Sequence, residues 1–183
     1  MKHTFRFLLA ALLACALTSC PETTVDENFG ARPAVLDADD WNGSWTHAGD
    51  DDDEARFTVL DAALGVVRLE DTDGKDKPSE ILLRQPTEAK TPLRFATMRE
   101  IGEEKAPLPL YLLREGDDGV IFIWGINHEA VAKAIKSGRL KGETKVVKND
   151  PQNHLIADPV NYPVLLEPQF WNWTEPMCLR RVK

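Results

Sequence analysis

The sequence predicts a mainly β protein, a small antiparallel β-barrel or sandwich with one short helix between its late strands. Three observations lead to this fold class. Short runs of β-branched, aromatic and alternating apolar residues recur from residue 41 onward. Clusters of Asp, Gly and Pro, which favour tight turns, separate these runs. One segment only, residues 128–137, has the apolar spacing of an amphipathic helix.

The first nineteen residues have the parts of an export signal. Lys2 and Arg6 give a basic start, and residues 7–17 form an apolar run shorter than the roughly 20 residues that span a bilayer. The run ends in the letters LTSC at residues 17–20, which resemble the lipobox of bacterial lipoproteins. The resemblance implies cleavage before Cys20 and acylation of that residue with diacylglyceryl and palmitate-type chains. The alternative is an ordinary signal peptide with a cysteine there by chance.

The lipobox resemblance divides the chain into three parts. Residues 1–19 are the signal peptide, residues 20–40 a lipidated tether, and residues 41–183 a single β-rich domain. A tether is expected because this stretch holds two prolines and several acids without periodicity. The resemblance implies a lipid-anchored protein of the cell envelope. In a Gram-negative bacterium, Pro21 after the cysteine implies the outer membrane, with the protein facing the periplasm.

The charge balance narrows the range of partners. Removal of the signal peptide takes away Lys2 and Arg6, which leaves 20 basic and 30 acidic residues and a net charge of −10. No nucleic-acid partner is expected, because phosphate neutralisation dominates that kind of binding. The expected partners are the membrane, through the lipid anchor, and a small hydrophobic ligand or an envelope protein. With Cys20 acylated, Cys178 is the one remaining thiol, so no intramolecular disulfide is expected.

Seven strand segments are expected before the helix, each bounded by turn residues. Their alternating or β-branched sequences are typical of half-buried strands. They are residues 41–48, 55–62, 65–71, 79–85, 92–100, 109–115 and 119–126.

The helix over residues 128–137 has recognisable ends. Asn127 is a good N-cap, Glu129 favours the first turn, and Gly138 suits the position after the helix. After it, residues 140–147 return to strand character, and residues 149–169 are expected to be mostly loop with one helical turn. Residues 177–182 are the expected last strand.

The letters WNGSW at residues 41–45 contain G-x-W near the start of the β domain. This resembles the first-strand signature of lipocalin-like, or calycin-like, barrels. The resemblance implies that Trp45, two residues after Gly43, closes one end of a barrel and stacks against Arg180 or Arg181. The chain departs from that family in lacking a T-D-Y-type motif, in placing its helix between strands and in ending on a strand.

Two groups of side chains are candidates for binding. Aromatic residues in the late strands and the C-terminal region are a candidate ligand cavity, or else part of an ordinary core: Phe122, Trp124, Phe170, Trp171 and Trp173. Basic residues on and after the helix are a candidate patch for an acidic partner, or else a solvated face: Lys133, Lys136, Arg139 and Lys141.

No catalytic or metal-binding motif is present. His47, His128 and His154 lack the spacing of zinc ligands, and the acidic stretches at residues 50–54 and 71–76 are interpreted as turns. We therefore expect no enzyme activity, no metal and no cofactor. Two function classes remain open. One is a lipoprotein with a barrel that binds a small ligand or lipid, and the other is a structural or interaction lipoprotein with a filled core.

Overall fold

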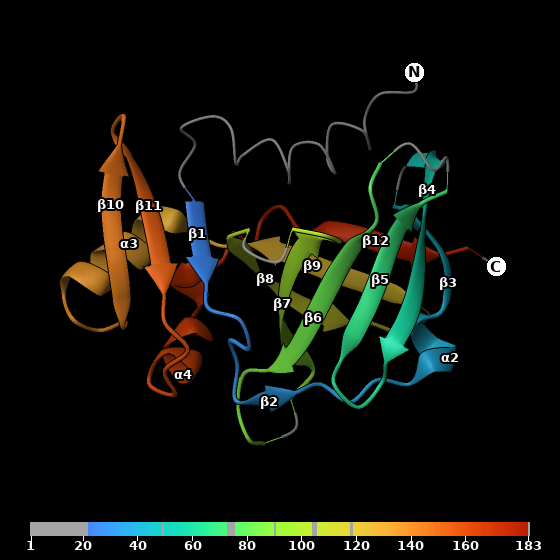
Figure 1. The fold of residues 1–183 in the computed structure, drawn as a ribbon, viewed down its shortest axis with the longest axis horizontal. Coiled ribbons are helices and arrows are strands. Elements are labelled where there is room, and N and C mark those ends of the chain that lie inside the picture. The colour runs from blue at the N-terminus through green and yellow to red at the C-terminus, as the bar shows by residue number, and fades with distance from the viewer. Residues whose placement is uncertain are drawn as a thin grey trace.

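The computed structural model describes residues 22–182 except 49, 73–75, 90, 104–105 and 118, and it does not describe the side chains of residues 50–53. Eight antiparallel strands form a closed barrel (Figure 1). Each pairs with the next along the chain, and the last strand pairs with both β3 and β9. The strands are β3 (Gly43–His47), β4 (Asp50–Asp61), β5 (Val66–Asp71), β6 (Ser79–Gln85), β7 (Leu93–Glu100), β8 (Leu108–Glu115), β9 (Val120–Gly125) and β12 (Met177–Arg181). The predicted mainly β fold class is confirmed, and the closed barrel decides between barrel and sandwich.

Alternation along the strands separates the interior of the barrel from its outside. In β5, Val67 and Leu69 are buried inside, whereas Arg68 and Glu70 form an ion pair outside. This is the period of two that a strand imposes on its side chains. The apolar positions of β5 therefore build the barrel core directly.

The two ends of the barrel differ. We define the upper rim as the end where β5 and β7 finish, at Asp71 and Glu100, and the lower rim as the end where β6 and β8 finish. The lower rim is covered by the chain that precedes β3. This chain includes β2 (Arg32–Pro33), which pairs with β6, and the short helix α2 (Ala38–Trp41). Ala34, Leu36 and Trp41 are buried against the barrel core.

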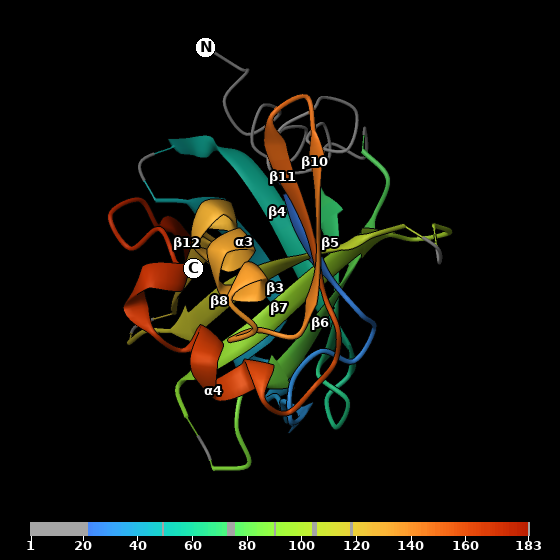
Figure 2. The same ribbon diagram turned by 90° about the vertical axis from the view of Figure 1, so that its left-hand side faces the viewer.

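A second layer lies against the outside of the barrel (Figure 2). Strand β1 (Glu22–Val25) pairs antiparallel with the first residues of β8 and parallel with β11 (Asp150–Leu155). Strand β10 (Gly142–Val147) pairs with β11. Three helices complete the layer: α3 (His128–Lys136), α4 (Asn161–Leu165) and the 3-10 helix η1 (Pro168–Phe170). A second hydrophobic core fills the space between this layer and the barrel wall.

The structure confirms the helix between the late strands and corrects the proposed tether. Residues 22–25 form a strand between β8 and β11, and Phe29 is 1% exposed. The segment from residue 22 to residue 40 is therefore part of the folded domain, not an extended linker. The expected loop at 149–169 likewise contains strand β11, whereas α4 agrees with the one helical turn expected there. Among the described residues, no helix is both long and apolar enough to cross a membrane.

Candidate functional site

The barrel encloses an apolar cavity of about 80 Å³. Two alanines in its wall, Ala55 and Ala96, lie where larger side chains would fill the space. Trp41 and Phe57 stand in edge-to-face contact, with ring centroids 6.2 Å apart. Apolar side chains make up nearly all of the lining: Trp41, Ala55, Phe57, Leu69, Ile81, Ala96, Thr97, Met98, Tyr111, Leu113, Ile121, Ile123, Met177 and Leu179.

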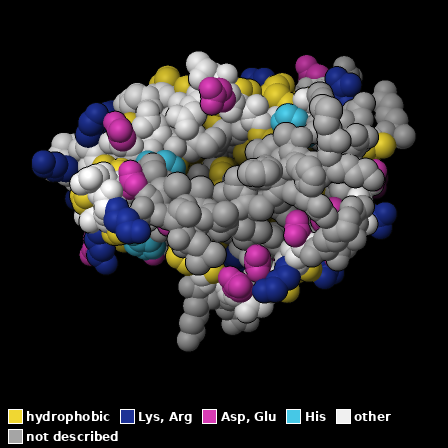
Figure 3. Space-filling view, turned by 90° about the horizontal axis from the view of Figure 1, so that it is seen from above, with side chains coloured by type: hydrophobic (Ala, Val, Ile, Leu, Met, Phe, Trp, Pro, Cys, Tyr) yellow, Lys and Arg dark blue, Asp and Glu magenta, His cyan; other side chains and the backbone are white. Residues whose placement is uncertain are grey.

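The cavity is less well covered toward the upper rim. Met98, Tyr111 and Met177 line it there and are only half-buried, as are Ile81 and Ile123. At the other end, the segment before β3 buries the core almost completely. Seen from above, hydrophobic side chains are visible in a hollow of this face (Figure 3). The upper rim is therefore the side from which an apolar group could enter.

A polar cluster lies inside the barrel near the lower rim. Nη2 of Arg94 is 3.2 Å from Oε1 of Glu115, and the indole Nε1 of Trp41 donates to the same oxygen at 3.0 Å. Arg94 is only 9% exposed, and its Nε atom is buried without a hydrogen-bond partner among the described residues. A buried guanidinium requires such a carboxylate, because an unpaired buried charge is costly. This cluster supports the floor of the cavity.

The structure brings together three of the four residues of the G-x-W signature. Trp45 lies opposite Arg181 in the β3–β12 pairing, so both side chains are on the inner face. The guanidinium of Arg181 lies across Gly43 and donates to the backbone oxygen of Asn42 at 2.6 Å. Arg180 lies opposite Thr46 and is exposed. Of the two arginines, Arg181 is thus the one beside Trp45.

The five candidate ligand-cavity aromatics lie outside the barrel. Trp124, Phe170 and Trp171 are buried in the second core, and Phe122 packs against it with its ring stacked on Trp124 at 6.0 Å. Trp173 is 38% exposed, 4.9 Å from the Trp124 ring. None of them lines the barrel cavity. For Phe122 and Trp124 the reason is the phase of β9, in which Ile121 and Ile123 point inward and the alternate positions 122 and 124 point outward.

The predicted basic patch is divided by ion pairs. Arg139 pairs with Glu167 and lies over the Phe170 ring, and Lys133 pairs with Glu129 at 3.9 Å. Lys133 and Lys136 line a groove between α3 and β10, whereas Lys141 and Arg139 do not.

Histidines hold β1 in the second layer. Nδ1 of His128 is 2.9 Å from Oγ1 of Thr23, and burial lowers the pKa of His128. His154 contacts Oγ1 of Thr24 through Nδ1 at 3.1 Å and Oδ1 of Asp26 through Nε2 at 3.0 Å. These contacts hold β1, which begins two residues after Cys20. Cys20 itself lies outside the described residues.

Several residues of the site have weak signals in the sequence. Arg94 shares the inward phase of β7 with Ala96 and Met98, so an arginine there indicates a buried charge that needs a partner. The sequence does not identify Glu115 as that partner.

Within the described part of the chain, no group of three or more His, Cys, Asp or Glu side chains could hold a metal ion.

Comparisons of this chain with protein-family models, with curated proteins and with solved structures gave no match.

Proposed function

We propose that the protein is a lipid-anchored lipoprotein of the cell envelope whose barrel binds the end of an aliphatic chain. The observation that carries this proposal is the apolar cavity inside a closed barrel, with half-buried side chains at its upper rim. Among the described residues, no charged side chain lines this cavity. A charged headgroup would lose its hydration there without gaining a partner, so only the apolar part of a ligand is expected to enter.

The size of the cavity limits the ligand class. At about 80 Å³ it is smaller than the roughly 150 Å³ cavity that holds benzene, and far below the roughly 300–1,000 Å³ of drug-sized pockets. A thin, flexible chain suits it better than a ring. Met98 and Met177 at the upper rim are unbranched and can adapt to such a chain. The end of a single acyl chain is therefore the proposed ligand.

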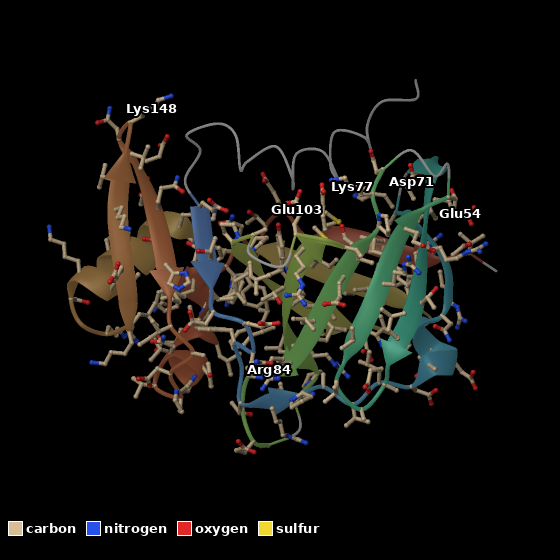
Figure 4. The ribbon with its side chains drawn as sticks, in the orientation of Figure 1. Glu54, Asp71, Lys77, Arg84, Glu103 and Lys148 are labelled. Carbon is tan, nitrogen blue, oxygen red and sulfur yellow. The ribbon has the colours of Figure 1, made fainter. Side chains whose placement is uncertain are left out.

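The position of the proposed anchor supports the same ligand class. Cys20 is two residues from the start of β1, a separation of at most about 7 Å along an extended chain. Strand β1 begins on the side of the molecule that carries the upper-rim residues Glu54, Asp71, Lys77 and Glu103 (Figure 4). An acylated Cys20 would hold this rim toward the membrane, where acyl chains are abundant.

Binding of sodium palmitate to the purified full chain, measured by isothermal titration calorimetry, tests the proposal. We expect one saturable site, weakened at least about tenfold by Ala96→Phe, because the larger ring fills the cavity. The control is Ala63→Phe at an exposed position in the turn after β4, which should leave binding unchanged. If the unaltered chain takes up no palmitate, or if Ala96→Phe binds it equally well, the barrel is not the binding site. The filled-core interaction lipoprotein then becomes the favoured class.

A further inference from the structure

One edge of the sheet ends at β10. In the part of the chain that the structure describes, β10 pairs only with β11, so one side of its backbone lacks a neighbouring strand. Val146 on this strand is 71% exposed and Val147 is 45% exposed. Exposed edge strands of this kind can pair with another chain.

A groove of about 880 Å³ lies between this strand and helix α3. Its helical wall includes Ala132, Lys133 and Lys136, and its strand wall includes Lys145 and Val146. The two elements lie side by side in both ribbon views (Figures 1 and 2). The groove therefore combines apolar contact surface, positive charge and unpaired strand backbone.

The walls of the groove are held together by a buried asparagine. The side chain of Asn153 accepts a hydrogen bond from Thr144 of β10 at 2.8 Å and donates one to the backbone oxygen of His128 in α3 at 2.9 Å. It also donates to Oγ1 of Thr23 at 3.0 Å. Because Asn153 is only 3% exposed, these bonds are shielded from water. The spacing between strand and helix is thus set before any partner arrives, which reduces the ordering cost of binding.

The charge of the groove favours an acidic partner. Among the described residues, Lys136 and Lys145 have no ion pair, whereas Lys133 pairs with Glu129. Glu129 and Glu143 also line the groove, so its three lysines exceed its glutamates by one, and Lys148 projects from the tip of the β10–β11 hairpin (Figure 4). This is an uneven distribution in a chain with a net charge of −8. Such a local field attracts acidic segments and repels basic ones.

We propose that this groove binds an extended acidic segment of another protein, which adds to β10 as a further strand. Backbone hydrogen bonds to the free side of β10 would supply affinity, and alternate side chains would supply specificity. Val146 shares the α3 face of β10 with Thr144, so side chains on that face of the added strand would contact Ala132 and Val146 beside Lys136. The alternate, acidic side chains would lie on the opposite face and meet Lys145. The proposal concerns a different surface from the barrel cavity, so the result with palmitate does not decide it.

The test uses a fluorescein-labelled peptide of alternating Glu and Val residues, titrated with the purified full chain and followed by fluorescence anisotropy. We expect saturable binding that weakens at least about tenfold in the Lys136→Glu/Lys145→Glu variant. The charge-matched control is Arg56→Glu/Lys77→Glu, which changes exposed side chains away from the groove and should shift the dissociation constant less than about twofold. N-methylation of alternate peptide amides should abolish binding, because it removes the strand's hydrogen-bond donors.

Three outcomes would overturn the proposal. The first is no saturable binding of the peptide by the unaltered chain at millimolar concentration. The second is binding that tolerates N-methylation, since strand addition requires those amides. The third is binding to phosphatidylglycerol vesicles that depends on Lys136 and Lys145 while the peptide does not bind. That result would assign the basic surface to anionic lipid.

Discussion

Glu115 accepts a hydrogen bond from the indole of Trp41 across 3.0 Å, and this contact joins the short helix α2 to the end of β8. The same carboxylate oxygen lies 3.2 Å from Nη2 of Arg94. One acidic side chain thus connects the cover of the lower rim with the buried guanidinium of Arg94. Because Glu115 pairs with Arg94, the otherwise apolar core of the barrel can contain a buried guanidinium.

Glu115→Ala is expected to lower the free energy of unfolding by about 2 kcal/mol, because it leaves the Arg94 guanidinium without its carboxylate. The partial exposure of Glu115, with 35% of its side chain accessible, keeps the loss below that of a fully buried pair. Urea denaturation gives the value. The double variant Arg94→Met/Glu115→Ala should lose less than the sum of the losses of Arg94→Met and Glu115→Ala, since it removes both charges. Additive losses would show that the two residues do not interact.

Gly65→Ala should destabilise the protein by about 3 kcal/mol, because two penalties coincide. Its φ of +69° is unfavourable for alanine, and the added Cβ would lie 2.4 Å from the backbone oxygen of Leu83 and 2.7 Å from that of Ala34. Gly138→Ala is the matched control, because its φ is +74° but nothing lies within 4 Å of the added Cβ. It should cost only about 1 kcal/mol. Thermal unfolding compares the two, and equal losses would mean that the close approach at Gly65 has no effect.

The pH dependence of stability should report on His128. Burial lowers its pKa below the ordinary value of 6.5, so the unfolded chain binds a proton more readily than the folded one. The stabilising contribution is present above about pH 6.5 and is lost as the pH falls toward the folded pKa. Glu22, whose pKa is raised by burial, acts in the opposite direction near its own titration range.

Urea midpoints measured from pH 7.5 to pH 5 test this expectation. The unaltered chain should lose stability over this range, and His128→Asn should lose less, because its amide does not titrate and can still face Thr23. A variant with the same pH profile as the unaltered chain would assign the effect to another group.

Most of the barrel strands could be predicted from sequence because their local patterns agree with the final structure. The exception is the start of β4, because its acidic run at residues 50–54, interpreted as a turn, is part of the strand. Strand β11 could not be predicted, since only Asn153 and Leu155 of this mainly polar segment are buried. Its strand conformation comes from pairing with β10 and with β1, and the latter lies about 130 residues away in the chain. No local pattern contains such a long-range contact.

The aromatic side chains of β9 show a second reason why the sequence alone could not place the site residues. Both faces of this strand are covered, by the barrel core on one side and the second core on the other. Both sets of alternating residues are therefore apolar, and periodicity cannot tell the inner face from the outer one. Phe122 and Trp124 are predicted to line a ligand cavity or an ordinary core, but their side of the wall depends on the pairing partners of β9.

The N-terminal segment gives the most direct test of the corrected domain boundary. A chain that begins at residue 22 should unfold cooperatively, whereas one that begins at residue 41 should lose the second layer. The shorter chain lacks β1, which lies between β8 and β11, and it lacks Phe29, whose ring is 5.6 Å from Phe95 and 5.1 Å from Tyr162. Hydrogen exchange should show loss of amide protection in β11 and α3 of the shorter chain.

A point substitution separates the loss of packing from the loss of strand pairing. Phe29→Ala keeps β1 but removes a ring that is 1% exposed, and it should lower the free energy of unfolding by about 3–5 kcal/mol. A flexible tether would tolerate both changes without effect. If the chain from residue 41 kept the thermal midpoint and the β11 protection of the longer chain, residues 22–40 would be dispensable for folding. They would then act as a tether, as the sequence predicts. Loss of protection with both changes would mean that the segment following Cys20 is a structural part of the domain.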